Sequence, residues 1–392
     1  MEFKDIKTPC YIVNESEYRD SISRLMDSFN SKWNGNCVFG YSVKTNHFPY
    51  LMNIAKEYGC YSEVVSKYEY YHAVSCGFSD DLVIFNGPNK MDILEDMLEK
   101  ECIINLDNSD EVETACNFKK QIKARIGLRI NLDLEKYIPG ETTVKDEVGR
   151  FGISYENGDL FKAIELLRNH GIKLSGFHLH HSTSSRSLKA FHTLSRFACQ
   201  IAKECNMTDI EYIDIGGGLF GGNYFKNKPS YDEYSDVITN ELKTTFDPSS
   251  TTLILEPGAA VLATSCDYLT SIINARSIKG TNIVTVDGSC LHINPFMKPK
   301  QENPCTIINP ARTLNEGETQ VIGGSTCMEM DRLYPKDNIY YVDCNSKLLF
   351  HCAGAYTMTH NSSFINLPPL VYVNRNGEYE LIRDQNINTM SL

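Results

Sequence analysis

Polar and glycine residues follow several short apolar runs of the sequence, at positions where buried strands would end. Lys44 follows the run Cys37–Val43, three consecutive glycines begin at Gly216, and Glu256 follows Thr252–Leu255. A lysine of lowered pKa can form a Schiff base with an aldehyde, and a glycine turn lets backbone N–H groups approach a phosphate. A carboxylate can keep a pyridine nitrogen protonated, so that the ring withdraws electrons. Together these residue types point to pyridoxal 5′-phosphate as a cofactor.

Each of these residues alone has an ordinary explanation. A lysine after a strand is most often a solvated strand end, and three glycines are more often a tight turn than a phosphate cradle. The histidines of the sixth run, His178, His180 and His181, are of a type that binds metals. No Asp, Glu or Cys partner with matching spacing supports a metal site, so we expect none. The cofactor prediction therefore rests on the combination of these residues, not on any one of them.

The composition limits the classes of partner and compartment. The 38 basic and 50 acidic residues give a net charge of −12, which disfavours nucleic acid as the main partner. No apolar run approaches the roughly 20 residues needed to cross a bilayer, so we expect no membrane segment. The first residues also lack the apolar segment of a signal peptide. The 14 cysteines form no C-x-x-C pair, which favours reduced thiols in the cytoplasm over a zinc site or a disulfide scaffold.

Eight short β-rich apolar runs alternate with segments of helical periodicity. The runs are 37–43, 61–66, 82–86, 102–106, 125–130, 174–180, 211–215 and 252–255. The helical candidates between them include 50–58, 68–76, 90–100, 110–120, 159–169, 188–205 and 231–245. Strand alternating with helix predicts parallel βα units. Eight such units fit a (β/α)8 barrel, in which the active site lies at the carboxyl ends of the strands; a doubly wound open sheet is the structural alternative.

The sequence changes character after about residue 265. Short apolar runs are there separated by turn signals, and helical periodicity is scarce. These runs are 268–278, 282–286, 306–308, 319–322, 348–352 and 370–373. The pattern predicts a second, mostly antiparallel β domain.

The motifs together resemble the fold-type III pyridoxal-phosphate decarboxylases, the group of ornithine, diaminopimelate and arginine decarboxylases. The resemblance extends from Thr8–Tyr11 (TPCY) to Gly354–Thr357 (GAYT), which is most of the chain. It implies an α/β fold like that of alanine racemase, with a TIM-like (β/α)8 barrel over residues 26–265. Residues 1–25 with 266–392 would form the mainly antiparallel β domain. It also implies a homodimer with shared active sites and a small amino-acid-like substrate.

The resemblance further implies roles for individual residues. Lys44 of YSVKTN matches the Schiff-base lysine, His180 matches the histidine that stacks on the pyridine ring, and Glu256 of EPG matches the carboxylate at the pyridine nitrogen. Cys327 of GGSTCMEMD matches the cysteine that enters from the partner subunit and handles the proton at Cα. The remaining positions that match cofactor-binding residues are Glu63, Arg129, Thr183, Gly216, Gly217, Gly218, Gly258 and Tyr356.

Three positions depart from the family pattern. Ala259 follows the EPG motif where the family has an arginine that contacts the phosphate. Met328, and Glu329 one residue further, stand where the family has an acidic residue directly after the cysteine. The segment around Asn294 lacks the arginine that diaminopimelate decarboxylases use for the distal carboxylate. We therefore expect Met328, Glu329 and Asn294 to meet a neutral or differently placed distal group of the substrate.

The predicted activity is a pyridoxal-phosphate-dependent α-decarboxylation of an amino acid or amino-acid conjugate, which releases CO2 and an amine. An amino-acid racemase of the same fold type is an alternative, but such racemases place an arginine at the pyridine nitrogen, where this chain has Glu256. A catalytically silent homologue that binds another decarboxylase subunit is a second alternative, which Ala259 favours and which the retained Lys44 and Cys327 oppose. An unrelated barrel hydrolase would leave Lys44 and the glycine turn unexplained.

Overall fold

The computed structural model describes residues 1–145, 147–222, 227–361 and 363–385. The described chain divides into two compact units. We call residues 21–221 and 227–260 the barrel unit, and residues 1–20, 222 and 261–385 the sheet unit. These units are defined by compactness alone. The domains expected from the sequence, a cofactor-binding barrel over 26–265 and a β domain over 1–25 with 266–392, stay predictions.

Eight parallel strands close the barrel. In order around it they are β2 (Cys37–Ser42), β3 (Tyr61–Val64), β4 (Val83–Phe85), β5 (Ile103–Leu106), β6 (Arg125–Asn131), β8 (Leu174–His178), β9 (Tyr212–Asp214) and β10 (Thr252–Leu255). Strand β10 pairs back with β2, so the sheet has no open edge along this ring. Each strand coincides with one of the eight predicted runs, and the barrel prediction is confirmed over the open sheet. The short β7 (Ile153–Ser154) adds to β6 outside the ring.

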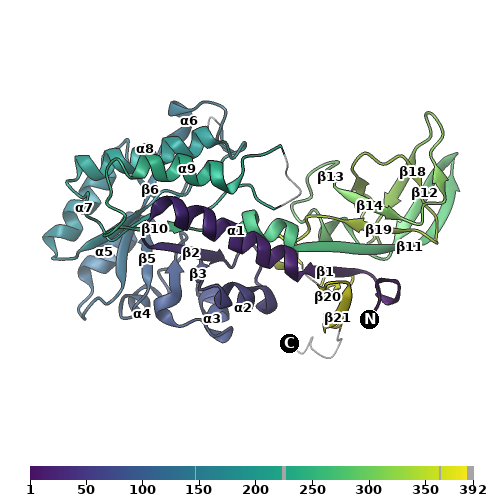
Figure 1. Ribbon diagram of the computed structural model, residues 1–392, viewed down its shortest axis with the longest axis horizontal. Coiled ribbons are helices and arrows are strands. Elements are labelled where there is room, and N and C mark those ends of the chain that lie inside the picture. The colour runs from purple at the N-terminus through teal and green to yellow at the C-terminus, as the bar shows by residue number, and fades with distance from the viewer. Residues whose placement is uncertain (146, 223–226, 362, 386–392) are drawn as a thin grey trace. The chain divides into compact units, whose positions relative to one another are not determined.

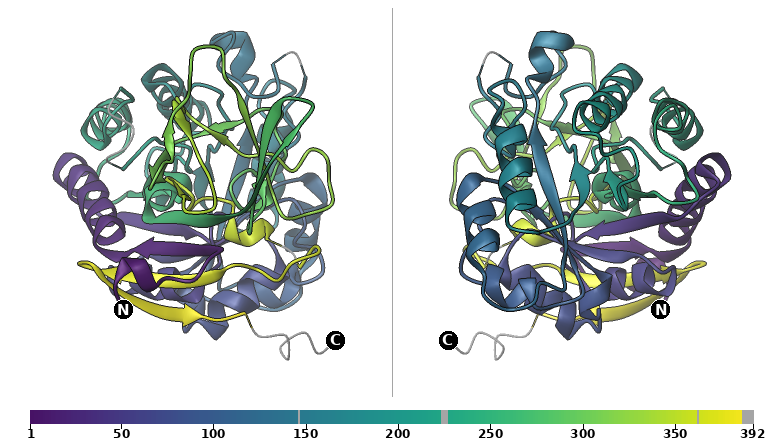
Figure 2. Two further views of the ribbon diagram at one scale, coloured as in Figure 1. Left: turned by 90° about the vertical axis from the view of Figure 1, so that its right-hand side faces the viewer. Right: turned by 90° about the vertical axis from the view of Figure 1, so that its left-hand side faces the viewer.

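Helices lie outside the ring of strands (Figures 1 and 2). They are α2 (Pro49–Glu57), α3 (Lys67–Ser75), α4 (Leu94–Leu98), α5 (Ser109–Asn117), α6 (Leu134–Tyr137), α7 (Asp159–Asn169), α8 (Leu188–Glu204), α9 (Tyr231–Leu242) and α10 (Gly258–Leu262). The predicted helix over 90–100 is wrong in length, since only α4 forms there. The chain before α4 turns so that the Lys90 side chain enters the interior and donates to the carbonyl of Gly87.

Local sequence explains where several helices begin. Ser66, Asn108 and Ser187 precede α3, α5 and α8, and each side chain accepts a hydrogen bond from a backbone N–H of the first turn. Ser230 and Glu233 form a capping box at the start of α9. These oxygens satisfy N–H groups that have no partner inside the helix.

Helix α1 (Glu15–Trp33) has no counterpart among the predicted helices. Most residues of α1 are polar, but buried apolar residues recur at intervals of three and four positions. They form a narrow stripe of Tyr18, Ile22, Leu25, Phe29 and Trp33. The indole N–H of Trp33 donates to the carbonyl of Thr251 at 3.2 Å. This stripe stabilises the helix by packing rather than by intrinsic propensity.

The sheet unit is built around strand β1 (Cys10–Asn14). It pairs antiparallel with β11 (Cys266–Ile278) and parallel with β20 (Leu370–Arg375). The same sheet contains β12 (Thr281–Val286), β14 (Cys305–Ile308), β16 (Gln320–Gly323), β19 (Lys347–Phe350) and β21 (Glu378–Arg383). Two-residue strands complete the unit: β13 (Glu302–Asn303), β15 (Arg312–Thr313), β17 (Tyr334–Pro335) and β18 (Tyr340–Tyr341). Most pairs are antiparallel, as predicted, and the β1–β20 and β12–β16 pairs are parallel exceptions in this sheet.

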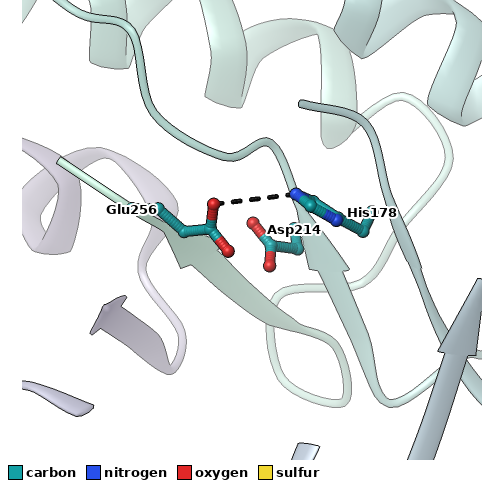
Figure 3. Close-up of side chains that lie close together, drawn as sticks. All are labelled: His178, Asp214 and Glu256. Atoms are coloured by element: carbon teal, nitrogen blue, oxygen red, sulfur yellow. Dashed lines mark ion pairs between the residues drawn. The ribbon is translucent and has the colours of Figure 1, made fainter. Parts of the chain in front are cut away.

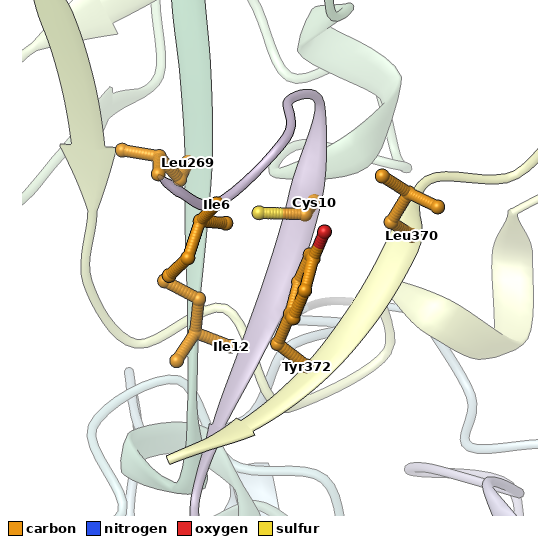
Figure 4. Packing of buried hydrophobic residues seen from close by; sticks show 6 residues of the cluster. All are labelled: Ile6, Cys10, Ile12, Leu269, Leu370 and Tyr372. Atoms are coloured by element: carbon orange, nitrogen blue, oxygen red, sulfur yellow. The ribbon is translucent and has the colours of Figure 1, made fainter. Parts of the chain in front are cut away.

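Apolar side chains hold the ends of the chain together inside the sheet unit. Figure 4 shows one cluster, formed by Ile6, Cys10, Ile12, Leu269, Leu370 and Tyr372, each at most 6% exposed. The cluster joins three strands that are distant in the sequence, so it fixes β1 between β11 and β20. Among the residues the structure describes, no helix is both long and apolar enough to span a bilayer.

Candidate active site

Lys44 lies two residues beyond the carboxyl end of β2, and its amino group contacts the carboxylate of Glu63 on β3. The Glu63 side chain is only 1% exposed, whereas that of Lys44 is 35% exposed. Adjacent parallel strands end at the same rim, which is why two residues 19 positions apart in the sequence meet here. The structure thus brings together two of the predicted site residues and leaves the Lys44 side chain partly exposed.

A buried ladder of side-chain hydrogen bonds connects Glu63 to Glu256. The Asn86 amide donates to Glu63 Oε1 at 3.1 Å and to Glu256 Oε1 at 2.5 Å. Asn105 Nδ2 donates to Asn86 Oδ1 at 2.8 Å, and the Tyr212 hydroxyl donates to Asn105 Oδ1 at 2.8 Å. Because Asn86 Oδ1 is used by Asn105, the NH2 group of Asn86 must face the two carboxylates. The ladder therefore fixes where both carboxylates point.

Three ionisable side chains converge from the ends of β8, β9 and β10. Figure 3 shows His178, Asp214 and Glu256 pointing toward one another, with His178 Nε2 at 3.6 Å from Glu256 Oε2. One potential ligand atom from each residue lies within 4.8 Å of the other two. Asp214 Oδ1 accepts a hydrogen bond from the Gly216 N–H at 2.8 Å. Asp214 Oδ2 and both ring nitrogens of His178 are buried and have no hydrogen-bond partner among the residues that the structure describes.

The two neighbouring carboxyl groups of this cluster have opposite pKa shifts. Burial raises the pKa of Asp214 well above its ordinary value of 3.8, and the neighbouring Glu256 raises it further. Burial also opposes ionisation of Glu256, but the attraction of His178 and Lys44 outweighs it and holds the Glu256 pKa below its ordinary value. Since like charges this close disfavour double ionisation, these two shifts favour the negative charge on Glu256 over Asp214.

His180 lies just beyond β8 and presents a neutral ring. Burial lowers the pKa of its imidazole well below 6.5, and the nearby Arg129 lowers it further. Its Nδ1 accepts a hydrogen bond from the Gly217 N–H at 3.1 Å. Arg129 Nη2 donates to the carbonyl of His180 at 3.4 Å, and Arg129 Nη1 lies 3.3 Å from Asp107 Oδ1. Arg129 therefore holds the loop that carries His180.

The glycine turn after β9 is required by close packing. Gly216 and Gly218 have positive φ angles of 71° and 93°. A Cβ atom at Gly216 would lie 2.5 Å from His180 Cβ, and one at Gly217 would lie 2.1 Å from the carbonyl oxygen of Glu256. A Cβ at Gly218 would meet no atom within 4 Å. The turn is thus packed against the site on one side and open on the other, as a backbone cradle for an anion must be.

Two further predicted positions lie in this part of the barrel. The Thr183 hydroxyl accepts a hydrogen bond from the Arg186 N–H at 3.2 Å. A Cβ at Gly258 would approach Thr45 Oγ1 to 2.5 Å, so a larger residue would displace the segment that follows Lys44.

These residues fit a phosphorylated pyridine aldehyde. The barrel rim offers the partly exposed Lys44 side chain, a neutral imidazole on His180, a buried ionised carboxylate on Glu256 and a glycine turn. The His178 and Asp214 polar atoms that lack partners among the described residues lie at the same rim. Together an amine, an imidazole ring, a carboxylate and backbone N–H groups can bind an aldehyde, an aromatic ring, a ring nitrogen and a phosphate.

Comparison with known proteins decides the family. The model of the family described as "Pyridoxal-dependent decarboxylase, pyridoxal binding domain" matches residues 19–263. The chain belongs to the pyridoxal-dependent decarboxylase family. Its cofactor is pyridoxal 5′-phosphate, and it is an amino-acid decarboxylase of the carboxy-lyase class.

Individual relatives agree with the family assignment. The decarboxylase is 26% identical over 386 residues to a probable chloroplastic diaminopimelate decarboxylase of Oryza sativa subsp. japonica, covering 96% of this chain and 75% of the relative. The crystal structure of diaminopimelate decarboxylase from M. jannaschii matches with a TM-score of 0.83 at 23% identity, over 98% of this chain and 91% of that one. Helicobacter pylori diaminopimelate decarboxylase complexed with L-lysine gives a TM-score of 0.82 at 19% identity, over 98% and 95%.

The remaining predicted residues of the decarboxylase belong to the sheet unit. Cys327 is exposed on the loop after β16. Met328 is half-buried, Glu329 is exposed, and the side-chain amide of Asn294 is hydrogen-bonded to both backbone groups of Lys298. Tyr356 is half-buried with a positive φ of 63°, and its ring centre lies 6.1 Å from that of Phe296.

Several site residues were missed by sequence reasoning. Asp214 is a carboxylate between two isoleucines directly before the glycine turn, and that isolated charge was the available signal. Asn86 and Asn105 end or interrupt apolar strands in the same way. In the sheet unit, buried Asp331 accepts hydrogen bonds from the Cys290 N–H and from Thr326, next to Cys327. Their shared signal is a polar residue inside an apolar run, which is costly to bury unless it is paired.

Proposed function

We propose that this decarboxylase binds its cofactor covalently through Lys44 and removes the α-carboxylate of an amino acid or amino-acid conjugate. The observation that carries the proposal is the linkage from the Lys44 amino group, through Glu63 and Asn86, to the ionised Glu256. When bound, pyridoxal phosphate supplies an electron-withdrawing ring that accepts the electron pair left at Cα as CO2 departs.

The barrel residues would orient the cofactor and balance its charges. The Glu63 carboxylate accepts a proton from the Lys44 amino group or returns one to it. Glu256 would hold a protonated pyridine nitrogen by its negative charge, and Asn86 and His178 keep that carboxylate in position. His180 offers a neutral ring face, since its Nδ1 is engaged by the Gly217 N–H. The backbone at Gly216, Gly217 and Gly218 would bind phosphate.

Residues outside these strands would complete the reaction. Thr183 and Tyr356 contribute hydroxyl groups to the phosphate, Gly258 keeps the backbone close, and Arg129 supports the His180 loop. The Cys327 thiol delivers the proton that replaces CO2 at Cα. Its position on an exposed loop of the sheet unit supports this role, because a thiol must be accessible to reach a substrate.

The substrate proposal rests on the absence of an arginine near Asn294. The relatives named above are diaminopimelate decarboxylases, but the segment around Asn294 has no arginine for a distal carboxylate. We therefore infer a substrate whose distal group is neutral or differently placed, bounded by Met328, Glu329 and Asn294. Measurement of CO2 release from a panel of L- and D-amino acids, with diaminopimelate, lysine, ornithine and arginine included, tests this. Turnover of diaminopimelate well above all others contradicts the inferred distal group.

We also propose a cytoplasmic homodimer with shared active sites, built from functional domains at 26–265 and at 1–25 with 266–392. The sheet unit exposes apolar side chains at Phe296, Met330, Ile339, Phe364 and Ile365, which supports an interface there. Sedimentation equilibrium gives the mass in solution. If the sites are shared, a mixture of inactive Lys44→Ala and Cys327→Ala chains regains part of the activity, and a mixture that stays inactive contradicts sharing.

A further inference from the structure

The cofactor phosphate needs a cation that the usual family position does not supply. Ala259 stands after the EPG motif, where the family resemblance calls for arginine. Arginine is favoured at phosphates because its planar group donates two hydrogen bonds and carries a permanent charge. The two cations already described at this rim have other partners, since Lys44 contacts Glu63 and Arg129 contacts Asp107 and the His180 carbonyl. His180 is neutral and Glu256 is negative.

Arg186 lies on the loop between β8 and α8, three residues after Thr183. The buried Tyr234 of α9 ties this loop to the segment after the glycine turn. Its hydroxyl donates to the carbonyl of Arg186 at 2.6 Å and accepts from the Phe220 N–H at 3.3 Å. Since Phe220 follows Gly218 by only two residues, one buried hydroxyl sets the spacing between the Arg186 loop and the glycine turn.

Two cations converge beside that turn. The Arg186 guanidinium carbon lies 4.8 Å from the centre of the Phe220 ring, and the Lys228 amino group lies 5.0 Å from the same centre. The two charges are therefore at most about 10 Å apart, which is near the screening length at physiological salt. No carboxylate in the described part of the chain forms an ion pair with either one. The Glu141 carboxylate accepts hydrogen bonds from Ser185 and Ser187 on either side of Arg186, but it forms no ion pair with either cation among the described residues. Two like charges this close without an ion-pair partner attract an anion.

We propose that Arg186, assisted by Lys228, binds the cofactor phosphate in place of the arginine missing at position 259. The assignment rests on the proposed function, because it requires pyridoxal phosphate at Lys44. Thr183, whose hydroxyl accepts from the Arg186 N–H, matches a family phosphate position, so the same short loop supplies both a hydroxyl and a cation. The Phe220 ring orients the guanidinium without neutralising it, as a cation–π contact does.

The test compares ligands that differ only in the phosphate. Full-length protein, freed of cofactor by dialysis, is titrated with pyridoxal phosphate and with pyridoxal, and binding is followed by visible absorption. We expect Arg186→Gln to weaken binding of pyridoxal phosphate by about 10- to 100-fold and to change pyridoxal binding by less than about twofold. Lys228→Gln should show a smaller loss of the same kind. The matched control is Arg196→Gln, which removes an exposed arginine of α8 that lies 5.2 Å from the Phe197 ring.

The outcomes separate this assignment from the proposed function. Wild-type protein that binds neither ligand overturns both. If wild-type protein binds pyridoxal phosphate but Arg186→Gln keeps the wild-type preference for it over pyridoxal, the assignment alone fails. A variant that loses both ligands equally also overturns it, since Arg186 would then support the fold rather than the phosphate. Selective loss of pyridoxal phosphate, absent in Arg196→Gln, supports it.

Discussion

The raised pKa of Asp214 predicts how stability responds to pH when Asp214 is replaced by Asn. Asp214 is fully buried on β9 and accepts the Gly216 N–H through Oδ1. The amide has the same shape as the protonated acid, so Nδ2 can take the place of the protonated Oδ2. The substitution therefore removes a titration from the folded state while preserving the packing.

The magnitude follows from the proton balance. The Asp214 pKa is raised above its ordinary value of 3.8 in the folded protein. As pH rises from that value toward the folded pKa, the folded state keeps one more proton than the unfolded state. The stabilisation from this group is fully present below pH 3.8. It falls by up to about 1.4 kcal/mol per pH unit above that value, until the pH reaches the folded pKa.

The assay is urea unfolding of cofactor-free wild-type and Asp214→Asn proteins at pH 5, 6 and 7. The variant lacks this titration. Its free energy of unfolding should therefore rise relative to that of wild type with increasing pH, by up to about 1.4 kcal/mol for each pH unit. Asp247→Asn is the control, because Asp247 is exposed with a lowered pKa and is ionised in both states over this range. A difference between Asp214→Asn and wild type that stays constant from pH 5 to 7 would contradict the raised pKa of Asp214.

Three further changes test other parts of the account. Lys44→Ala should abolish CO2 release, because the cofactor loses its covalent attachment, while the far-UV circular dichroism stays unchanged. Normal turnover by this variant would contradict the proposed mechanism. Cys327→Ala should slow product formation by about 100-fold or more, as expected for loss of a general acid, with cofactor binding intact; unchanged kcat would remove Cys327 from the reaction. Lys90 and Glu111 form a fully buried ion pair at 2.7 Å. Lys90→Met should destabilise the protein by about 3–5 kcal/mol, and adding Glu111→Leu should restore much of the loss. If the double variant is no more stable than Lys90→Met, the buried Glu111 charge left without its partner does not cause the loss of stability.

The barrel could be predicted because its strands are short, apolar and regularly separated by helices. Each run, such as Arg125–Ile130, lies within a few residues of an observed strand. The polar residues at the ends of several strands also marked the correct rim, and Lys44 and Glu63 do meet there. These features depend on local composition and on the rule that barrel sites form at the carboxyl ends of strands.

The ladder and the charge distribution could not be predicted in this way. Asn86 matters because it contacts Glu63 and Glu256 across the barrel, and a single sequence does not give such distances. The raised pKa of Asp214 likewise depends on burial beside Glu256. Helix α1 was missed because its apolar stripe is narrow among polar residues, and the helix over 90–100 was overestimated because Lys90 turns inward. Tertiary contacts decide each of these cases.

The most direct test of the central claim is to locate the lysine that holds the cofactor. The purified full-length protein is treated with borohydride, digested, and mapped by mass spectrometry for a pyridoxyl group. Two lysines of the barrel are compared as candidates for the labelled residue. Lys90 is fully buried in an ion pair, and Lys44 lies against Glu63. We expect the label on Lys44 alone, with loss of the visible absorption band on reduction. A label on Lys90, or no label after addition of pyridoxal phosphate, would contradict the account.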